Sequence, residues 1–226
     1  MAIWLGLCGV ALVVAYLLGS FPTGYIAGKL LKGIDIREVG SGSTGATNVL
    51  RTLGKGPGAF VLVIDCLKGV FAIALIYWLF SFAPAQNLIP STVDIPIWQP
   101  WMITLSGLFA ILGHSKSIFL GFSGGKSVAT SLGILLAMNW QVGVATAVVF
   151  AVCVAISRIV SLSSISGAIA VPILMVILQQ PLPYILFGVA GGLYVILRHR
   201  TNIERLLAGM EPKIGQKLAT DEAVDG

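Results

Sequence analysis

The chain alternates between long apolar segments and short polar ones. An α-helix rises about 1.5 Å per residue and a bilayer has about 30 Å of hydrocarbon, so the longer segments are able to cross a membrane as helices. Proline and glycine mark many segment ends, and Pro22 and Pro172 predict kinks in the first and sixth segments. The pattern predicts seven transmembrane helices, the third to fifth of them short, at residues 3–29, 57–82, 101–113, 125–139, 142–157, 163–179 and 183–198.

Composition agrees with a membrane protein. The 226 residues are 57% hydrophobic and 10% charged, with a mean hydropathy of +0.96, whereas soluble domains carry about 25% charged residues. The N-terminal apolar run lacks the basic start of a signal peptide and is too long for one, so it is interpreted as the first span. We therefore expect an all-α integral membrane protein forming a single domain over residues 1–226. A short polar tail starts at about residue 199, with an amphipathic turn at "NIERLL".

The basic residues predict the orientation of the chain. They follow the first, third, fifth and seventh predicted spans, and Lys68 is the exception. The positive-inside rule then places the N-terminus outside and the C-terminus in the cytoplasm. Tryptophans cluster near the opposite interface, as an aromatic belt would: Trp4, Trp78, Trp98, Trp101 and Trp140. The basic residues on the predicted cytoplasmic side are Lys29, Lys32, Arg37, Arg51, Lys55, Lys116, Lys126, Arg158, Arg198, Arg200, Arg205, Lys213 and Lys217.

Two loops rich in glycine and serine lie on this basic side. "GSGSTGATN" at residues 40–48 precedes Arg51, and "SGGKS" at residues 123–127 contains Lys126. Unhindered backbone N–H groups form concave sites for oxyanions, and Arg and Lys add positive charge. Two such loops predict a site for two phosphate groups, although turns and close helix packing also use these residues. The candidate binding residues of the loops are Ser41, Ser43, Gly45, Ala46, Thr47, Asn48, Arg51, Gly124, Gly125 and Lys126.

Nucleotide and metal sites are not supported. A phosphate-binding loop for nucleotides needs a glycine five residues before Gly125, but Leu120 stands there, and no strand precedes the loop. His114 and His199 lack a third ligand at a clear spacing, so no metal is expected. The three cysteines lie in apolar runs and are interpreted as small buried hydrophobic residues.

Several polar residues keep two interpretations. His199 and Asn202 have two interpretations. Either both contact the substrate, or His199 lies at the membrane interface and Asn202 caps the next helix. Asp65 and Lys68 lie three residues apart in a span, where charge is costly, and we expect them to pair and support the bundle. Arg158 is interpreted as an anchor at the membrane surface, although nearby serines keep it a candidate for the site.

Four segments together resemble one known family. "GSGSTGATNVLRTLGK", "GHSKSIFLGFSGGKSVATSLG" and "SLSSISG" closely resemble the three signature segments of the bacterial acyl-phosphate:glycerol-3-phosphate acyltransferases, the PlsY family, and "RHRTNI" resembles their C-terminal stretch. The resemblance covers essentially the whole chain. It implies transfer of a fatty acyl group from acyl phosphate to the 1-hydroxyl of glycerol 3-phosphate, giving lysophosphatidic acid and phosphate in phospholipid synthesis, without a cofactor. Local departures lie at Ser43-Thr44, at "SKSI" and at Ser127.

The resemblance also implies residue roles. Glycerol 3-phosphate would contact Ser41, Arg51, Lys126, His199 and Asn202. The acyl phosphate would use the two loops, notably Thr47, Asn48, Gly124 and Gly125, with Ser164 as a further contact. Residues expected to take part in catalysis are Ser41, Asn48, Arg51, Lys126 and His199.

No Ser-His-Asp arrangement is visible, so direct attack by the hydroxyl is expected, its proton passing to a substrate phosphate oxygen or to His199.

The expected location is the bacterial inner membrane, with the site on the cytoplasmic side. Expected partners are the bilayer, the two substrates and, transiently, the enzyme that makes acyl phosphate, with no nucleic acid. A transporter for a small organic anion is the alternative, but the predicted outer loops hold no cation. A purely structural membrane protein would leave the paired loops unexplained.

Overall fold

The computed structural model describes residues 1–216, and its regular structure in that range is helical apart from an isolated bridge between Ser117 and Ser123. Lys217, one of the basic residues counted above, lies outside the described residues. In chain order the helices are α1 (Ala2–Ser20), α2 (Thr23–Lys32), α3 (Ala46–Leu53), α4 (Lys55–Ser81), α5 (Ala83–Gln86), α6 (Ile95–Ser115), the 3₁₀ turn η1 (Ile118–Leu120), α7 (Val128–Met138), α8 (Trp140–Ser157), α9 (Val160–Ile177), α10 (Leu182–Arg198) and α11 (Arg200–Leu207).

Helix length and composition confirm a protein with several membrane spans. Within residues 1–216, five segments are long and apolar enough to cross a membrane: α1 with α2, α4, α6, α8 and α9. A sixth is added if α10 and α11, which meet at a bend of 62°, form one span. The apolar helix α7, with 11 residues, is shorter than these. The count of seven and the orientation of the termini stay predictions.

Three predicted helix starts were wrong by three residues or more, and one of them is the sixth, because α9 begins at Val160 and not at residue 163. The third predicted span began at residue 101, but α6 begins at Ile95 and has 21 residues, with Pro96 in its first turn. Proline fits there because the N–H groups of a first turn have no partner within the helix. The fourth was predicted to begin at residue 125, but α7 begins at Val128, because Ser127 has a left-handed backbone conformation with φ of 62°.

The predicted kink at Pro22 is an interruption of the first span. α1 ends at Ser20 and α2 begins at Thr23. The Phe21 carbonyl at this break accepts a hydrogen bond of 2.6 Å from Lys68 Nζ, which also lies 2.5 Å from Asp65 Oδ1. The structure thus confirms that Asp65 and Lys68 pair, and it gives Lys68 a second partner at the helix break. Pro172 lies inside α9, which continues past it.

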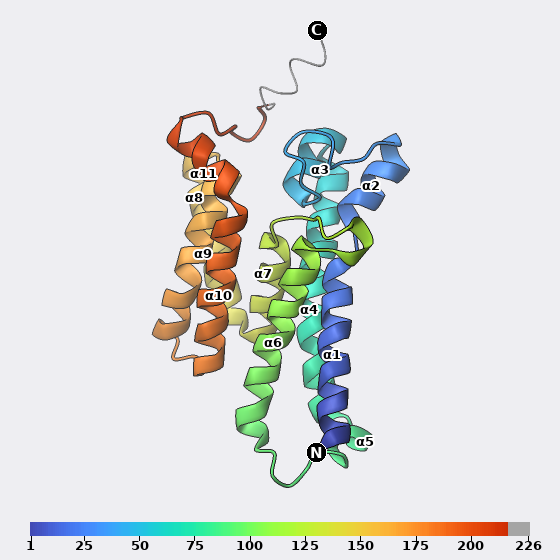
Figure 1. Cartoon of the computed structure of the whole chain (residues 1–226). Helices are drawn as coiled ribbons and strands as arrows, with labels where there is room; N and C mark the ends of the chain where they lie inside the picture. Colours follow the sequence, from blue (N-terminus) through green and yellow to red (C-terminus); the bar gives the residue numbers. More distant parts are fainter. Residues whose placement is uncertain (217–226) are drawn as a thin grey trace.

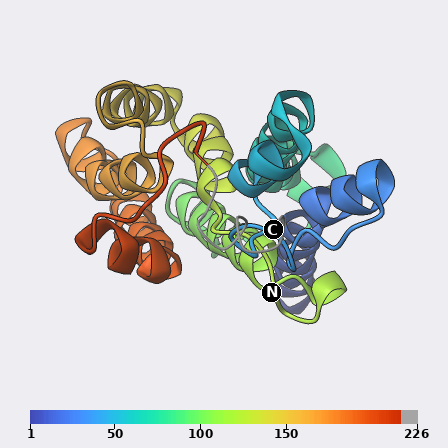
Figure 2. The ribbon, with the colours of Figure 1, turned by 90° about the horizontal axis from the view of Figure 1, so that it is seen from above.

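The helices form two groups that meet along the middle of the molecule. α1, α4, α6 and α7 pack together on one side, and α8, α9, α10 and α11 on the other (Figures 1 and 2). The groups meet where α6 packs against α10 and α7 against α8. Gly133 of α7 faces the backbone of Cys66 in α4, so a Cβ there would collide with it, which explains how closely these helices approach. We call the end that carries α2, α3 and α11 the polar end (Figure 1).

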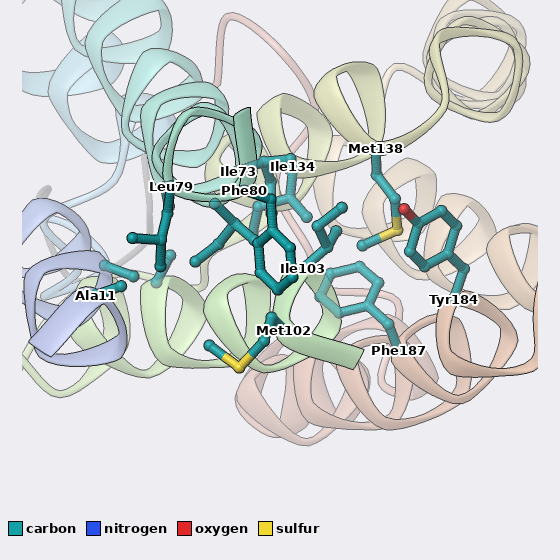
Figure 3. Close-up of a cluster of buried hydrophobic side chains, with 14 of the residues drawn as sticks. Ala11, Ile73, Leu79, Phe80, Met102, Ile103, Ile134, Met138, Tyr184 and Phe187 are labelled. Carbon is teal, nitrogen blue, oxygen red and sulfur yellow. The ribbon is translucent and has the colours of Figure 1, made fainter. Parts of the chain in front are cut away.

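The tryptophans lie at the opposite end, and the main apolar core runs from that end through the middle of the bundle. Trp4 is fully buried and packs edge-on against Phe80, with ring centroids 5.1 Å apart, so it belongs to the core and not to the predicted aromatic belt. Trp78 and Trp140 are exposed, as a belt requires. Figure 3 shows part of the core, where Phe187 and Tyr184 of α10 point toward side chains of α6 and α7.

Candidate active site

A cavity of about 370 Å³ lies between the two helix groups. Its lining changes from polar residues at the polar end to apolar residues of α7, α8, α9 and α10. The cavity therefore has room for a ligand with a polar head and an apolar tail. Most predicted binding residues line it: Ser41, Ser43, Gly45, Ala46, Thr47, Asn48, Arg51, Lys126, Ser164, His199 and Asn202. Gly124 and Gly125 are not among the lining residues.

The side chain of Asn48 holds the first loop in shape. Its Oδ1 accepts a hydrogen bond of 2.9 Å from the Ser41 N–H. Its Nδ2 donates to the carbonyls of Ile36, Val39 and Ser43 at 2.9–3.0 Å. Asn48 is 1% exposed, so these bonds form away from water. The geometry favours a role in positioning the loop over the predicted role in the chemical step.

Lys126, Asn202 and Glu211 form a hydrogen-bonded chain at the polar end of the cavity. Lys126 Nζ donates to Asn202 Oδ1, and Asn202 Nδ2 donates to Glu211 Oε1 at 2.6 Å. Burial and the neighbouring Arg205 lower the pKa of Lys126 to about 8. Asn202 had the alternative prediction of a helix cap, and that alternative is wrong, because α11 begins at Arg200, two residues before it.

Among residues 1–216, the two carboxylates that line the cavity are each paired with a cation that does not line it. Glu211 Oε2 lies 2.7 Å from Arg205 Nε, and Asp65 is paired with Lys68. Burial raises the pKa of Glu211, but hydrogen bonds from Asn202, Ser161 and Arg205 more than offset it and hold that pKa below its usual value. The two carboxylates therefore do not cancel the charge that Lys126 presents to the cavity, and the site favours an anion.

Gly124 and Gly125 carry the second loop past the cavity instead of lining it. Their carbonyls accept hydrogen bonds from Arg198 Nη2 at 3.4 and 3.2 Å. The His114 ring lies directly beside Gly125, where a Cβ would collide with it. The loop is thus held between α6 and α10 and sets the position of Lys126. His114 also lines the cavity, so it both supports the loop and borders the site.

Arg37 joins the first loop region to the second. Its guanidinium lies 2.6 Å from Asp35 Oδ2 and donates to the Leu120 carbonyl at 3.2 Å and to Ser123 Oγ at 3.1 Å. Hydrogen bonding to Arg37 lowers the pKa of Asp35 to about 2. Arg37 was predicted as one of many basic residues on this face, and its bridging role depends on contacts that the sequence does not show.

His199 lies at the bend between α10 and α11 and is 3% exposed. Its Nδ1 lies 2.7 Å from the Val195 carbonyl, which is only an acceptor, so Nδ1 carries a proton. The other ring nitrogen, Nε2, is therefore the atom left for contact with a ligand in the cavity. This supports the interpretation of His199 as a substrate contact.

Glu211 is the main residue that sequence reasoning missed. It lies in the segment interpreted as a polar tail, yet it is 8% exposed and accepts hydrogen bonds from Ser161, Asn202 and Arg205. A lone acid after a basic helix was the available signal. Arg158, kept as a candidate, does not line the cavity, and its carbonyl accepts a hydrogen bond from the Ile214 N–H at 2.8 Å. In residues 1–216 no cluster of three His, Cys, Asp or Glu side chains is arranged to hold a metal.

Comparison with known proteins decides which family this architecture belongs to. The family described as glycerol-3-phosphate acyltransferase matches residues 9–209. The chain belongs to the glycerol-3-phosphate acyltransferase family. Over 221 residues, 98% of each chain, it is 81% identical to the glycerol-3-phosphate acyltransferase of Trichormus variabilis and 82% identical to that of a Nostoc species. The predicted family is confirmed, and with it the predicted enzyme class, an acyltransferase of phospholipid synthesis. The transporter interpretation loses its support.

Two solved structures are similar to this acyltransferase over nearly its whole length. One is the crystal structure of PlsY, an integral membrane glycerol 3-phosphate acyltransferase, in its glycerol 3-phosphate form, with a TM-score of 0.79 and 35% identity over 97% of this chain and 99% of the other. The other is the lysophosphatidic acid form, with a TM-score of 0.76 and 34% identity over 92% and 95%.

Proposed function

We propose that this acyltransferase moves a fatty acyl group from acyl phosphate to the 1-hydroxyl of glycerol 3-phosphate, giving lysophosphatidic acid and phosphate. One observation carries the proposal. Arg51, Lys126 and Asn202 come from three distant parts of the chain and line a single cavity whose other part is apolar. The two similar PlsY structures are described as glycerol 3-phosphate and lysophosphatidic acid forms, which are the acceptor and the product of this reaction.

In this proposal, glycerol 3-phosphate is held at the polar end of the cavity. Arg51 offers a planar pair of N–H groups that suits a phosphate, and Lys126 offers a point charge. Asn202 holds Lys126, Ser41 adds a hydroxyl, and His199 presents Nε2. Burial strengthens each of these interactions, because the local dielectric is lower than that of water.

The phosphate of the donor would lie along the first loop, and its acyl chain in the apolar part. Thr47 and Ser164 line the cavity beside Ser43, Gly45 and Ala46, so hydroxyl and backbone groups are near the donor head. Gly124 and Gly125 would act indirectly, by holding Lys126. Leu62 of α4 lines the cavity and is 48% exposed, so the cavity reaches the outer surface of the bundle, where the chain would enter from lipid.

The chemical step is direct transfer. The 1-hydroxyl oxygen attacks the acyl carbon, an ester C–O bond forms, and the bond between the acyl carbon and the phosphate oxygen breaks. The hydroxyl proton passes to a phosphate oxygen of a substrate, so protons balance without a protein base, and His199 is the alternative acceptor. Phosphate is a good leaving group, so positioning and charge stabilisation supply most of the rate.

The membrane arrangement is also part of the proposal. Added to the five long apolar segments, α7 as one span and the bent pair of α10 and α11 as another would give seven spans. The polar end would then face the cytoplasm of the bacterial inner membrane, where glycerol 3-phosphate and the enzyme that makes acyl phosphate are found. Two single-cysteine variants of a cysteine-free protein test this orientation. They are Lys116→Cys at the polar end and Asn87→Cys at the opposite end. A membrane-impermeant thiol reagent should label only Asn87→Cys in intact cells.

Reconstitution in vesicles tests the reaction. The purified protein is given glycerol 3-phosphate with acyl phosphate, acyl-CoA or acyl carrier protein, and lysophosphatidic acid is measured. We expect acyl phosphate to be the one donor of the three that gives product. Lys126→Met should make product about 100-fold more slowly or worse, and the matched surface variant Lys116→Met should work at a near-normal rate. Product from acyl-CoA but not from acyl phosphate would overturn the proposed donor.

A further inference from the structure

The apolar part of the cavity is a pocket of limited depth. Along α10 its lining runs from His199 to Phe187, on the order of 18 Å at 1.5 Å per residue. Its deepest residues on α7, α9 and α10 are Leu135, Val171 and Phe187, and each is buried in the main core. Beyond them the core is filled, as Figure 3 shows for Phe187, which lies in one cluster with Ile103 and Ile134. An acyl chain that follows α10 therefore meets a closed end.

Glycines open this pocket from two sides. Gly167 of α9 and Gly188, Gly191 and Gly192 of α10 all line it. They are not equivalent. A Cβ at Gly188 would press on the Met175 sulfur at 2.9 Å, and one at Gly192 would press on the Ala168 carbonyl oxygen at 2.7 Å. These two glycines are needed for the packing of α9 against α10.

Gly191 and Gly167 instead leave enough room for a Cβ. A Cβ at Gly191 would lie 3.5 Å from Ile111 Cδ1 and 3.7 Å from Phe187 Cζ, which are ordinary contacts. A Cβ at Gly167 would lie 3.6 Å from Thr146 Cγ2. Both glycines are buried and in helices, where glycine costs about 1 kcal/mol relative to alanine. Helix packing does not require them, and the space they leave belongs to the pocket.

We propose that Gly191, assisted by Gly167, sets the length of acyl chain that this enzyme accepts, because the missing side chains leave room that a long chain needs on its way to the closed end of the pocket. Gly191 lies about 12 Å along α10 from His199, at 1.5 Å per residue. A side chain there shortens the usable pocket and leaves the polar end unchanged. This rests on the proposed function for the path of the acyl chain.

The experiment compares octanoyl phosphate, whose chain is too short to reach Gly191, with hexadecanoyl phosphate, whose chain passes it, in vesicles. Gly191→Leu should lower the ratio of kcat/KM for the long donor to that for the short one by more than tenfold, at about fourfold for each methylene that loses its place. Gly191→Ala should change the ratio in the same direction by up to about fourfold. The matched control is Gly9→Leu, because Gly9 is exposed on α1 with nothing within 4 Å of an added Cβ. Its ratio should equal that of the unmodified protein.

The outcomes are separable. An unchanged ratio in both Gly191 variants overturns the inference and means that the chain leaves through the opening near Leu62. Equal loss with both donors also overturns it, because a packing defect does not distinguish chain lengths. If Gly191→Leu fails to fold, as judged by thermal unfolding in detergent, Gly191→Ala decides. If the unmodified protein uses only acyl-CoA, the proposed donor fails, and the same ratio measured with two acyl-CoA esters still tests Gly191.

Discussion

Lys126 donates a hydrogen bond to the side-chain oxygen of Asn202, although the two residues lie 76 positions apart in the chain. Lys126 belongs to the loop before α7, and Asn202 to α11 in the other helix group. Glu211 holds the amide nitrogen of Asn202, so the oxygen is the atom that faces Lys126. The bond thus joins the two helix groups at the polar end of the cavity and fixes the position of the Lys126 ammonium.

This bond predicts strong coupling between Lys126 and Asn202 in catalysis. Lys126→Met should lower kcat/KM for glycerol 3-phosphate by about 100-fold or more, as expected when a charge that stabilises the transition state is lost. Asn202→Ala should cost at least tenfold by releasing Lys126. The double variant should lose much less than the product of the two single losses. Steady-state kinetics of the four proteins measures this, and multiplicative losses would show that the residues act independently.

The pKa of Lys126 predicts the basic limb of the pH profile. That pKa is lowered to about 8 by burial and by Arg205, so the charged form dominates below pH 8 and is lost above it. We expect kcat/KM to fall about tenfold per pH unit above pH 8. Lys126→Arg should remove this limb, because arginine keeps its charge throughout that range. If the basic limb of the pH profile keeps its position in Lys126→Arg, the limb belongs to another titrating group.

Asn48 should matter mainly for the shape of the first loop. Asn48→Ala removes four hydrogen bonds and leaves buried carbonyls and the Ser41 N–H without that partner. The free energy of unfolding should fall by about 2–4 kcal/mol, with KM for glycerol 3-phosphate raised. Asn87→Ala, at an exposed position, is the control and should change stability by less than about 0.5 kcal/mol. Full stability with a large loss of kcat would point to a direct role in chemistry.

The buried pair of Asp65 and Lys68 predicts an asymmetric response to substitution. Asp65 is 2% and Lys68 5% exposed. Replacing Lys68 by Met leaves a buried carboxylate without its cation and should destabilise the fold by about 3–5 kcal/mol. Combining it with Asp65→Leu should recover most of that loss, because neither charge then remains. Thermal unfolding in detergent gives the comparison, and a double variant no better than Lys68→Met would contradict a simple pairing role.

Arg37 predicts coupling between the two loop regions. Arg37→Ala removes hydrogen bonds to Asp35, the Leu120 carbonyl and Ser123. We expect a loss of about 1–3 kcal/mol in stability and a several-fold rise in KM, because the loops are no longer joined. Lys55→Ala is a control in which an exposed basic residue is removed at the same end of the molecule. Equal effects of the two substitutions would mean that only net charge matters.

Several parts of the site could be predicted from the sequence. Ser41, Arg51 and Lys126 lie in loops whose glycine, serine and cations indicate an oxyanion site by residue type alone. His199 and Asn202 needed the family resemblance, because two polar residues three positions apart fit many roles. For Glu211 the sequence offered only a weak signal, an acid after a basic helix, since its importance comes from three hydrogen bonds that it accepts from residues up to 50 positions away.

By itself the sequence determined that this protein lies in a membrane as a helical bundle and that its polar chemistry gathers at one end. Long apolar runs and the placement of charge carry that information locally, because the bilayer constrains each segment separately. Only the tertiary structure decided that Arg51, Lys126 and Asn202 line one cavity, that Gly124 and Gly125 stand beside it, and that Gly191 borders its apolar part. These facts depend on how distant helices pack, and packing is a property of side chains in contact that no single segment specifies.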